Sequence, residues 1–312
     1  MKKIIAMLLA LAMLASFAGC AAEAPAATEA PAAPEAPAAT EAPAASEAAT
    51  EAAASVATIK EGKLTVAISP DFAPMEFVDP TKTGQDMYVG FDVFLAKYLA
   101  EEMGLELELM PMDFGACQAA VSMGKVDMSI SGFSWTEERA ANYNLSDYYY
   151  AGDNETEQVL ITTAENAGKF TTAESMAGLK VGAQAASLQE NLCKEQLPDC
   201  ELVVYTDINT GALQLKKGDF DVMAVATGNA DSIIAKNPEL ALAGFNFEVS
   251  DEESNNLILL QKGNDAMTEA VNELLAKAYE AGYYGEWYAA AEELAGIGEE
   301  VSYDENGNPI TG

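Results

Sequence analysis

The 312-residue sequence contains no histidine and a single arginine, Arg139. Without histidine the chain lacks the usual imidazole base and the commonest zinc ligand, so Ser-His-Asp and Cys-His catalysis are excluded. Positive charge is scarce altogether, with 16 lysines and arginines against 50 acids and a formal net charge of −34. We therefore do not expect nucleic acid or an anionic membrane surface as a partner, because phosphate binding needs a basic surface.

The one arginine ends the stretch Ser131–Arg139 (SGFSWTEER), which follows a strand-like run and contains a helix-start pattern. Any lysine would serve for general charge balance in so acidic a chain. A guanidinium adds a rigid fork that grips a carboxylate through two parallel hydrogen bonds. We therefore interpret Arg139 as the group that holds the carboxylate of a small ligand. The alternative is an internal ion pair with one of the chain's own carboxylates.

The N-terminus has the pattern of an export signal. Lys2 and Lys3 precede an apolar run over residues 4–18, which is too short to span a bilayer comfortably. Residues 17–20 (FAGC) resemble a bacterial lipoprotein processing site, which implies cleavage before Cys20 and lipid attachment to its sulfur. Residues 1–19 would then be a signal peptide, and the lipid would anchor the protein to the outer face of the cytoplasmic membrane. An ordinary secreted protein with a different cleavage site is the alternative.

Residues 20–57 are predicted to form a tether behind the lipidated cysteine. Proline recurs there every six residues, from Pro25 to Pro43, with glutamates at the same spacing and Ala, Thr and Ser between them. This composition has no large side chains to bury, and proline opposes helix formation, so we expect a solvated, semi-extended segment. The remaining 255 residues, 58–312, exceed a typical single core and suit two lobes.

Strand-like and helix-like patterns alternate along the folded part. The predicted strands cover residues 63–69, 105–110, 126–131 and 179–184, and the predicted helices cover residues 90–104 and 114–123. Such alternation is typical of a parallel sheet with helices on both faces. Residues 121–128 (VSMGKVDM) also align without gaps to residues 215–222 (LKKGDFDV), each reading as a helix end, a glycine stop and a strand that begins with Asp. Two copies of one unit predict two lobes of the same architecture.

A last amphipathic helix, capped by Asp265 and ending near Gly282, indicates that the chain returns to its first lobe. We place the two crossings near residues 151–160 and 248–257, where they would form a hinge beside a closing cleft. The predicted organisation is lobe 1 over 58–152, lobe 2 over 158–250, a return to lobe 1 over 257–297 and a polar C-terminal tail over 298–312.

Four cysteines remain to be assigned. Cys20 would carry the lipid, and Cys117 lies on an apolar helical pattern that predicts a buried free thiol. Cys193 and Cys200 flank a polar segment of an exported protein, so a local disulfide and two free thiols are both open. We expect no metal site and no cofactor.

Six stretches, taken together, resemble the extracellular solute-binding proteins of polar amino acid ABC transporters. They are DFAPMEF (71–77), GFDVFLAKYLAEEMG (90–104), MDFGACQAAVSMGKVDMSISGFSWTEERA (112–140), LSDYYY (145–150), VGAQAASLQE (181–190) and GYYGEW (282–287). The resemblance implies a periplasmic-binding-protein-like α/β fold with two doubly wound lobes joined by a two-strand hinge. It also implies a monomeric substrate-binding component, not an enzyme, that delivers a small ligand to ABC permease and ATPase subunits.

The same resemblance implies roles for individual residues. Phe72 and Phe114 match aromatic positions that sandwich the ligand's side chain, with core packing as the alternative. Arg139 matches the carboxylate-binding arginine. The other matching positions contact the ligand from strand ends or complete the site from the second lobe: Ser131, Gly132, Ser134, Ser187 and Gln189.

One departure concerns the ligand's amine. The family usually has an Asp at the position of Ala226 to bind an α-ammonium group. Two sets of residues could replace it: the acids Asp71, Glu76 and Asp113, or the neutral acceptors Thr227 and Asn229. Alternatively, the ligand is not a standard α-amino acid, because an amine buried without a countercharge is costly.

We therefore expect a small carboxylate-bearing solute with an apolar or aromatic part, contacted by Phe72, Phe114, Phe133 and Trp135. Two competing functions stay open. One is an exported dehydratase-like lyase on the same fold, and the other is a sensor component that presents its ligand to a receptor.

Overall fold

The computed structural model describes residues 56–149 and 157–296. By its contacts, the chain divides into residues 1–49 and a unit of residues 50–312, and the description concerns the second unit. The predicted signal peptide, Cys20, nearly all of the tether, residues 298–312 of the tail and most of the first crossing (150–156) lie outside the described residues.

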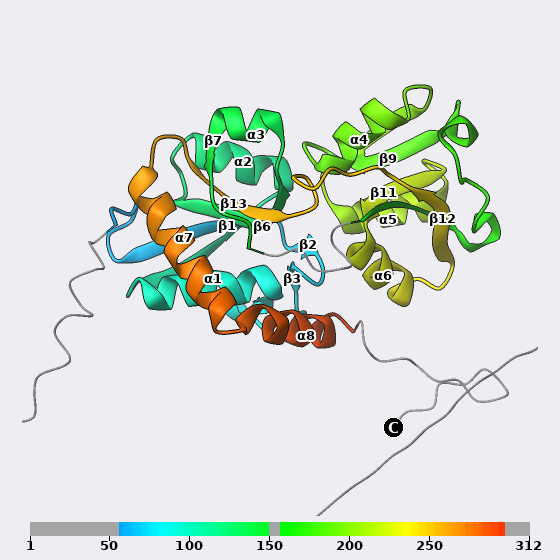
Figure 1. Ribbon diagram of the computed structural model, residues 1–312. Coiled ribbons are helices and arrows are strands. Elements are labelled where there is room, and N and C mark those ends of the chain that lie inside the picture. Colours follow the sequence, from blue (N-terminus) through cyan, green and yellow to red (C-terminus); the bar gives the residue numbers. More distant parts are fainter. Residues whose placement is uncertain (1–55, 150–156, 297–312) are drawn as a thin grey trace, which may run out of the picture. The chain divides into compact units, whose positions relative to one another are not determined.

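A first five-stranded sheet has the strand order β5-β1-β6-β13-β7 (Figure 1). Its strands are β1 (Lys63–Ile68), β5 (Glu106–Pro111), β6 (Met128–Ser134), β7 (Tyr143–Leu145) and β13 (Asn256–Gln261). β5, β1 and β6 run parallel, whereas β13 runs antiparallel to β6 and β7. A small sheet of β2 (Asp71–Phe72), β3 (Glu76–Val78) and β4 (Tyr88–Val89) follows β1.

Helices cover both faces of this sheet. α1 (Phe91–Glu102), α7 (Asp265–Glu280) and α8 (Tyr283–Ala295) share one apolar core with β1 and β6, and α2 (Phe114–Ser122) shares a second core with Phe133 and Leu257. The short α3 (Glu137–Asn142) follows β6 directly. Gly90 precedes α1 with a φ of +120°, and a Cβ there would lie 2.3 Å from the carbonyl oxygen of Met75, so only glycine fits this approach.

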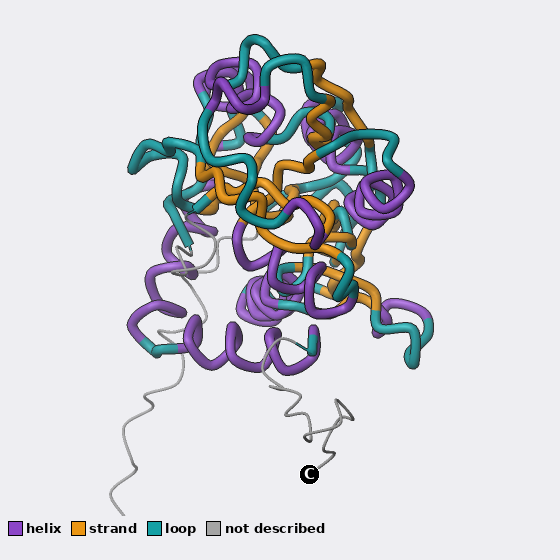
Figure 2. The backbone as a smooth tube through the Cα atoms, turned by 90° about the vertical axis from the view of Figure 1, so that its right-hand side faces the viewer, coloured by secondary structure: helices purple, strands orange, loops and turns teal. Residues whose placement is uncertain are grey.

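A second five-stranded sheet has the order β10-β9-β11-β8-β12. Its strands are β8 (Gln158–Thr163), β9 (Lys180–Gln184), β10 (Glu201–Tyr205), β11 (Val222–Ala226) and β12 (Leu240–Asn246). α5 (Ile208–Lys217) and α6 (Thr227–Lys236) pack on one face, and α4 (Leu188–Gln196) packs on the other. In the perpendicular view of Figure 2, strands lie inside and helices around them. We call the parts built on the first and second sheets the first and second lobes.

The two sheets repeat one plan, with β5-β1-β6 in the first matching β10-β9-β11 in the second. Asp127, just before β6, accepts a hydrogen bond from the Thr65 backbone N–H at 2.7 Å, and Asp221, just before β11, accepts one from the Lys180 backbone N–H at 2.9 Å. The repeated aspartates thus join neighbouring parallel strands at their starts. The α/β fold class is confirmed, although the sheets are mixed, because β13 and β8 join them antiparallel.

Two smaller points concern the cysteines and a helix cap. Cys193 and Cys200 are free thiols in this structure, which is one of the two alternatives that the sequence left open. Cys193 lies in the apolar core beneath α4, and burial raises the pKa of its thiol well above the usual value. The cap of α7 is Asn264, whose side chain accepts from the Met267 N–H, and not Asp265. Cys117 is buried and free, as predicted.

Within the two described ranges, no helix combines the length and apolar character that crossing a bilayer needs.

Candidate functional site

A small cavity of about 30 Å³ lies where strand ends of both lobes meet. Eight of the nine residues predicted to bind ligand line it, namely Phe72, Phe114, Ser131, Gly132, Ser134, Arg139, Ser187 and Gln189. The ninth, Thr227, does not line this cavity, because its hydroxyl donates to the Glu157 backbone oxygen at 3.0 Å. The fold therefore brings together residues that lie up to 117 positions apart, from 72 to 189.

Arg139 is buried in the wall of this cavity, with 3% of its surface exposed. Its Nη1 donates to the Ser134 backbone oxygen at 2.7 Å, and its Nη2 donates to the Ala186 backbone oxygen of the second lobe at 3.0 Å. The guanidinium carbon lies 5.5 Å and 5.2 Å from the ring centres of Phe114 and Phe133, so both rings contribute cation–π contacts.

Within the described residues no carboxylate forms an ion pair with Arg139. Burial lowers the pKa of Arg139 to about 10, which leaves the guanidinium charged at neutral pH. The internal ion pair considered as an alternative is therefore not present in this part of the chain. A buried cation whose partners are carbonyl oxygens and aromatic faces is suited to an external anion.

The short helix after β6 aims this arginine. Thr136 is the N-cap of α3, and its hydroxyl accepts from the Arg139 backbone N–H at 3.1 Å. Glu137 and Glu138 occupy the first turn. Because the turn begins two residues after β6 ends, the arginine side chain can reach back to the carbonyl of Ser134, the last residue of that strand.

Gly132 allows the Phe72 ring to lie against β6. The glycine has a φ of +55°, and a Cβ at this position would lie 2.6 Å from Cε1 of Phe72. Both the left-handed backbone and the close approach exclude larger side chains. Phe72 also packs against apolar residues of both lobes, so it is at once a cavity-lining and an interlobe residue.

Two buried acids support this strand end from behind. Asp92 accepts hydrogen bonds from the Gly132 N–H at 2.8 Å and the Tyr149 hydroxyl at 2.9 Å, and Glu76 accepts from the Ser131 hydroxyl. Burial raises the pKa of Asp92 to about 6, and burial with the nearby Asp92 charge raises that of Glu76 well above its usual value. Glu76 thus lies beneath the cavity and does not line it.

Asp71 does line the cavity, and it bridges the two lobes. Its Oδ2 accepts from the Ile208 N–H at 2.7 Å and from Gln184 Nε2 at 3.2 Å, both in the second lobe, while Oδ1 accepts from the Ser69 hydroxyl at 2.9 Å. Burial, helped by the charge of Asp207, raises the pKa of Asp71 from its usual 3.8 to about 6.

The second lobe contributes the turn between β9 and α4. Ala186 has a φ of +61°, a strained value for a residue with a side chain, and its carbonyl accepts from both Arg139 Nη2 and Gln118 Nε2. Ser187 is the N-cap of α4 and accepts from the Glu190 N–H at 3.1 Å. Gln189 donates to Gln158 at 2.6 Å.

The lining residues of the second lobe that were not predicted include two polar ones, Gln184 and Tyr205. Both are the last residues of parallel strands, β9 and β10. The rule that ligands bind at the carboxyl ends of such strands would have identified them.

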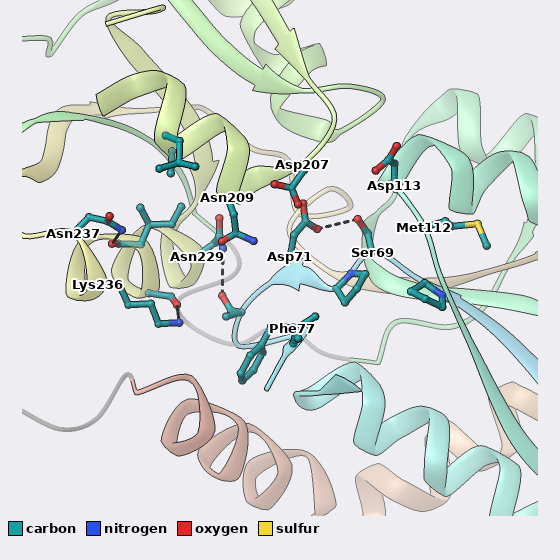
Figure 3. A pocket seen from close by; sticks show the side chains of 18 residues that line it. Ser69, Asp71, Phe77, Met112, Asp113, Asp207, Asn209, Asn229, Lys236 and Asn237 are labelled. Carbon is teal, nitrogen blue, oxygen red and sulfur yellow. Dashed lines mark hydrogen bonds between the residues drawn. The ribbon is translucent and has the colours of Figure 1, made fainter. Parts of the chain in front are cut away.

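A second cavity of about 680 Å³ adjoins the first, and the two share Asp71 and Asn229 (Figure 3). Asp113 and Asp207 line this large cavity, as does Lys236, whose Nζ lies 5.8 Å from the ring centre of Phe77. Phe77 therefore belongs to the large cavity. Of the other aromatic candidates, Phe133 is fully buried against Phe114, with ring centres 4.7 Å apart, and Trp135 packs at the edge of the same core.

With this geometry in hand, the comparisons with known proteins give the class. The model of the bacterial extracellular solute-binding proteins, family 3, matches residues 64–290, and the chain belongs to this family.

Individual relatives agree with this assignment. A probable histidine-binding protein of Campylobacter jejuni is 28% identical over 227 residues, which cover 70% of this chain and 84% of the relative. A solved amino acid ABC transporter substrate-binding protein of Streptococcus pneumoniae, bound to L-arginine, is 34% identical with a TM-score of 0.69, covering 75% of this chain and 96% of that one.

One further structure bears on catalysis. An ancestral amino-acid-binding protein, described as a precursor of cyclohexadienyl dehydratase, is 27% identical with a TM-score of 0.63 and covers 73% of this chain and 95% of its own.

Proposed function

We propose that this protein is the substrate-binding component of an ABC importer and captures a small carboxylate-bearing solute, an amino acid or a related molecule, in the small cavity. The observation that carries the proposal is Arg139, a buried guanidinium that forms no ion pair within the described residues. A solute carboxylate would supply the missing anion and accept two hydrogen bonds from the fork. The relatives support an amino acid as the solute, since one is a probable histidine-binding protein and another was solved with bound L-arginine.

Capture requires the lobes to move apart. A volume of about 30 Å³ is too small for an amino acid, so we expect hydrogen bonds between the lobes to break when a solute enters. Those bonds include Arg139 to Ala186 and Asp71 to Ile208. Closing around the solute then restores contacts between the lobes, which is the hinge type of ligand-linked closure.

The partners follow from the same proposal. We expect the protein to act as a monomer, to deliver its solute to ABC permease and ATPase subunits and to be held on the outer face of the cytoplasmic membrane through a lipid on Cys20. A sensor role uses the same closing motion, and binding to a receptor in place of a permease would distinguish it.

A binding role fits the site better than catalysis. Three acids line the two cavities: Asp71, Asp113 and Asp207. The described lining of the small cavity contains no histidine or lysine that could complete an acid–base pair with Asp71. The relationship to a dehydratase precursor keeps a lyase as the second candidate. Incubation with a carboxylated ring substrate decides between them, because a binding protein returns its ligand unchanged.

A thermal-stability screen tests the proposed function. The purified full chain is unfolded and refolded to remove carried-over ligand and then melted with amino acids, keto acids, hydroxy acids and aromatic carboxylates. A tight ligand at a hundredfold excess over its dissociation constant stabilises the fold by about 2.7 kcal/mol. We expect at least one carboxylate to raise the melting temperature, and its amide, which lacks the charge, to raise it much less. A panel in which no carboxylate raises the melting temperature would contradict the proposal.

A further inference from the structure

The small cavity carries one positive and one negative side chain. Among the described residues that line it, Arg139 is the only base and Asp71 the only acid. The two do not pair with each other. Arg139 donates to two backbone carbonyls and to the side-chain oxygen of Gln118, whereas Asp71 accepts from the Ile208 N–H, Gln184 and Ser69. A solute with only a carboxylate would compensate the charge of Arg139 and leave the negative charge of Asp71 in the same cavity without a cation.

We propose that Asp71 binds the protonated amine of the solute, so that the ligand of the small cavity is an amino carboxylate. The inference rests on the proposed function, in which Arg139 holds the carboxylate. It also distinguishes the three acids considered from the sequence, because Glu76 lies beneath the cavity and Asp113 lines only the large one. The charge that holds the amine would then come from the first lobe, in place of the Asp that the family usually has at the position of Ala226 in the second lobe.

Asp71 has the capacity to accept a further donor. A carboxylate offers about four lone-pair positions, and three are used, two on Oδ2 and one on Oδ1. Oδ1 can therefore accept from an amine while Oδ2 keeps its bonds to the second lobe.

Two neutral oxygens of the second lobe complete the site. Asn229 Oδ1 and the Tyr205 hydroxyl are buried, with 2% and 5% of their residues exposed, and neither has a hydrogen-bond partner among the described residues. Both residues line the small cavity. The Asn229 amide nitrogen points its donors to the Ala73 carbonyl at 3.4 Å, which leaves the oxygen for another donor. Buried polar atoms without partners are rare, and an ammonium group, with three N–H donors, would satisfy Asp71, Asn229 and Tyr205 together.

This placement makes amine binding part of closure. Asp71 belongs to the first lobe, and Asn229 and Tyr205 belong to the second. An ammonium group held between them would join the lobes at the same place as the bond from Asp71 to the first residue of α5, Ile208.

The test compares Asp71→Asn with Asp113→Asn in the full chain. The exchange at 71 removes the charge but keeps an oxygen that can accept from the Ile208 N–H. The fold and this hydrogen bond between the lobes should therefore persist. The control makes the same change at an acid that lines only the large cavity. The probes are the amino acid that binds the wild-type chain most tightly among the twenty L-amino acids, and the 2-hydroxy acid with the same side chain, each titrated by calorimetry.

We expect Asp71→Asn to lower the affinity for the amino acid by about thirtyfold or more, because the substitution removes one partner of a buried charge pair. The hydroxy acid, which has no positive charge, should change by less than about threefold in affinity, a difference of under 1 kcal/mol. The control should leave both affinities unchanged.

Three results would overturn the inference while leaving the proposed function intact. They are an Asp71→Asn chain that keeps its amino acid affinity, a variant that loses both probes equally, and a wild-type chain that prefers the hydroxy acid. Absence of binding by every carboxylate would instead contradict the proposed function, and this inference with it.

Discussion

At the scale of single residues, the site depends on a few positions where chemistry and geometry allow no substitute. The sequence drew attention to Arg139 as a lone arginine in an acidic chain, and the structure buries it in the cavity wall, while its ligand-binding role stays a prediction. The contacts of Asp71 were not predictable, since its neighbours Ile208 and Gln184 come from a part of the chain more than 100 residues away. Local pattern does not report such a contact, so the sequence left three acids as equal candidates for the amine.

Gly132→Ala tests the packing of Phe72 on β6. The new Cβ would lie 2.6 Å from the ring on a backbone with a φ of +55°, so we expect a loss of about 1–3 kcal/mol in the free energy of unfolding and weaker ligand binding. Urea unfolding and calorimetry measure the two effects.

Gly285→Ala is the matched control for this substitution. That glycine lies inside α8, and a Cβ there meets nothing within 4 Å, so the change should be neutral or stabilise by up to about 1 kcal/mol. Equal stability of the two variants would show that the Phe72 ring can move away from Gly132 without cost.

At the scale of elements, the sequence predicted α1 and α2 and the parallel strands β1, β5 and β9 to within about two residues, and it failed where strands pair across the chain. β1 and α1 lie within one or two residues of their predicted ends. β6 continues to Ser134 although a stop at Ser131 was predicted, because Phe133 and Ser134 still pair with β13 beyond an irregular stretch of the ladder that contains Gly132. The antiparallel places of β8 and β13 depend on long-range pairing, which periodicity does not encode.

The buried acids at and beneath the small cavity lead us to expect that a lower pH stabilises the folded state. Burial raises the pKa of Asp71 and Asp92 to about 6 and that of Glu76 further above its usual value. A carboxyl group whose folded pKa is raised stabilises the folded state at low pH, and this contribution is lost as the pH rises through the folded value. For Asp71 the shift from 3.8 corresponds to about 3 kcal/mol.

We therefore expect the melting temperature of the full chain without added ligand to rise as the pH falls from 8 to 5.5. Relief of repulsion in a chain of net charge −34 acts in the same direction. Glu76→Gln, which keeps the acceptor for Ser131, should reduce the slope, whereas Glu137→Gln at an exposed position of α3 should not. A melting temperature that stays level or falls over this range would contradict the burial of these acids.

At the scale of the whole molecule, two similar lobes meet at a cavity whose walls both supply. Within the part of the chain that the structure describes, five hydrogen bonds join the lobes, and they involve Asp71, Asn229, Arg139 and Gln118. Four of them use a backbone group as donor or acceptor, so closure depends on the turn after β9 and the start of α5 more than on complementary side chains. A pairing of this kind leaves little trace in the sequence, whereas the duplicated helix-to-strand unit revealed the two lobes directly.

The most direct measurement is calorimetric titration of the refolded full chain and its Arg139→Lys variant with the tightest-binding amino acid of the screen and with the amide of that amino acid. Lysine keeps the charge but loses the fork, so we expect the amino acid to bind at least about tenfold more weakly, with the melting temperature of the unliganded chain nearly unchanged. The amide should bind weakly and equally to both proteins. Unchanged amino acid affinity in the variant, or an amide that binds as tightly as the acid, would contradict the account of Arg139 as the carboxylate-binding group.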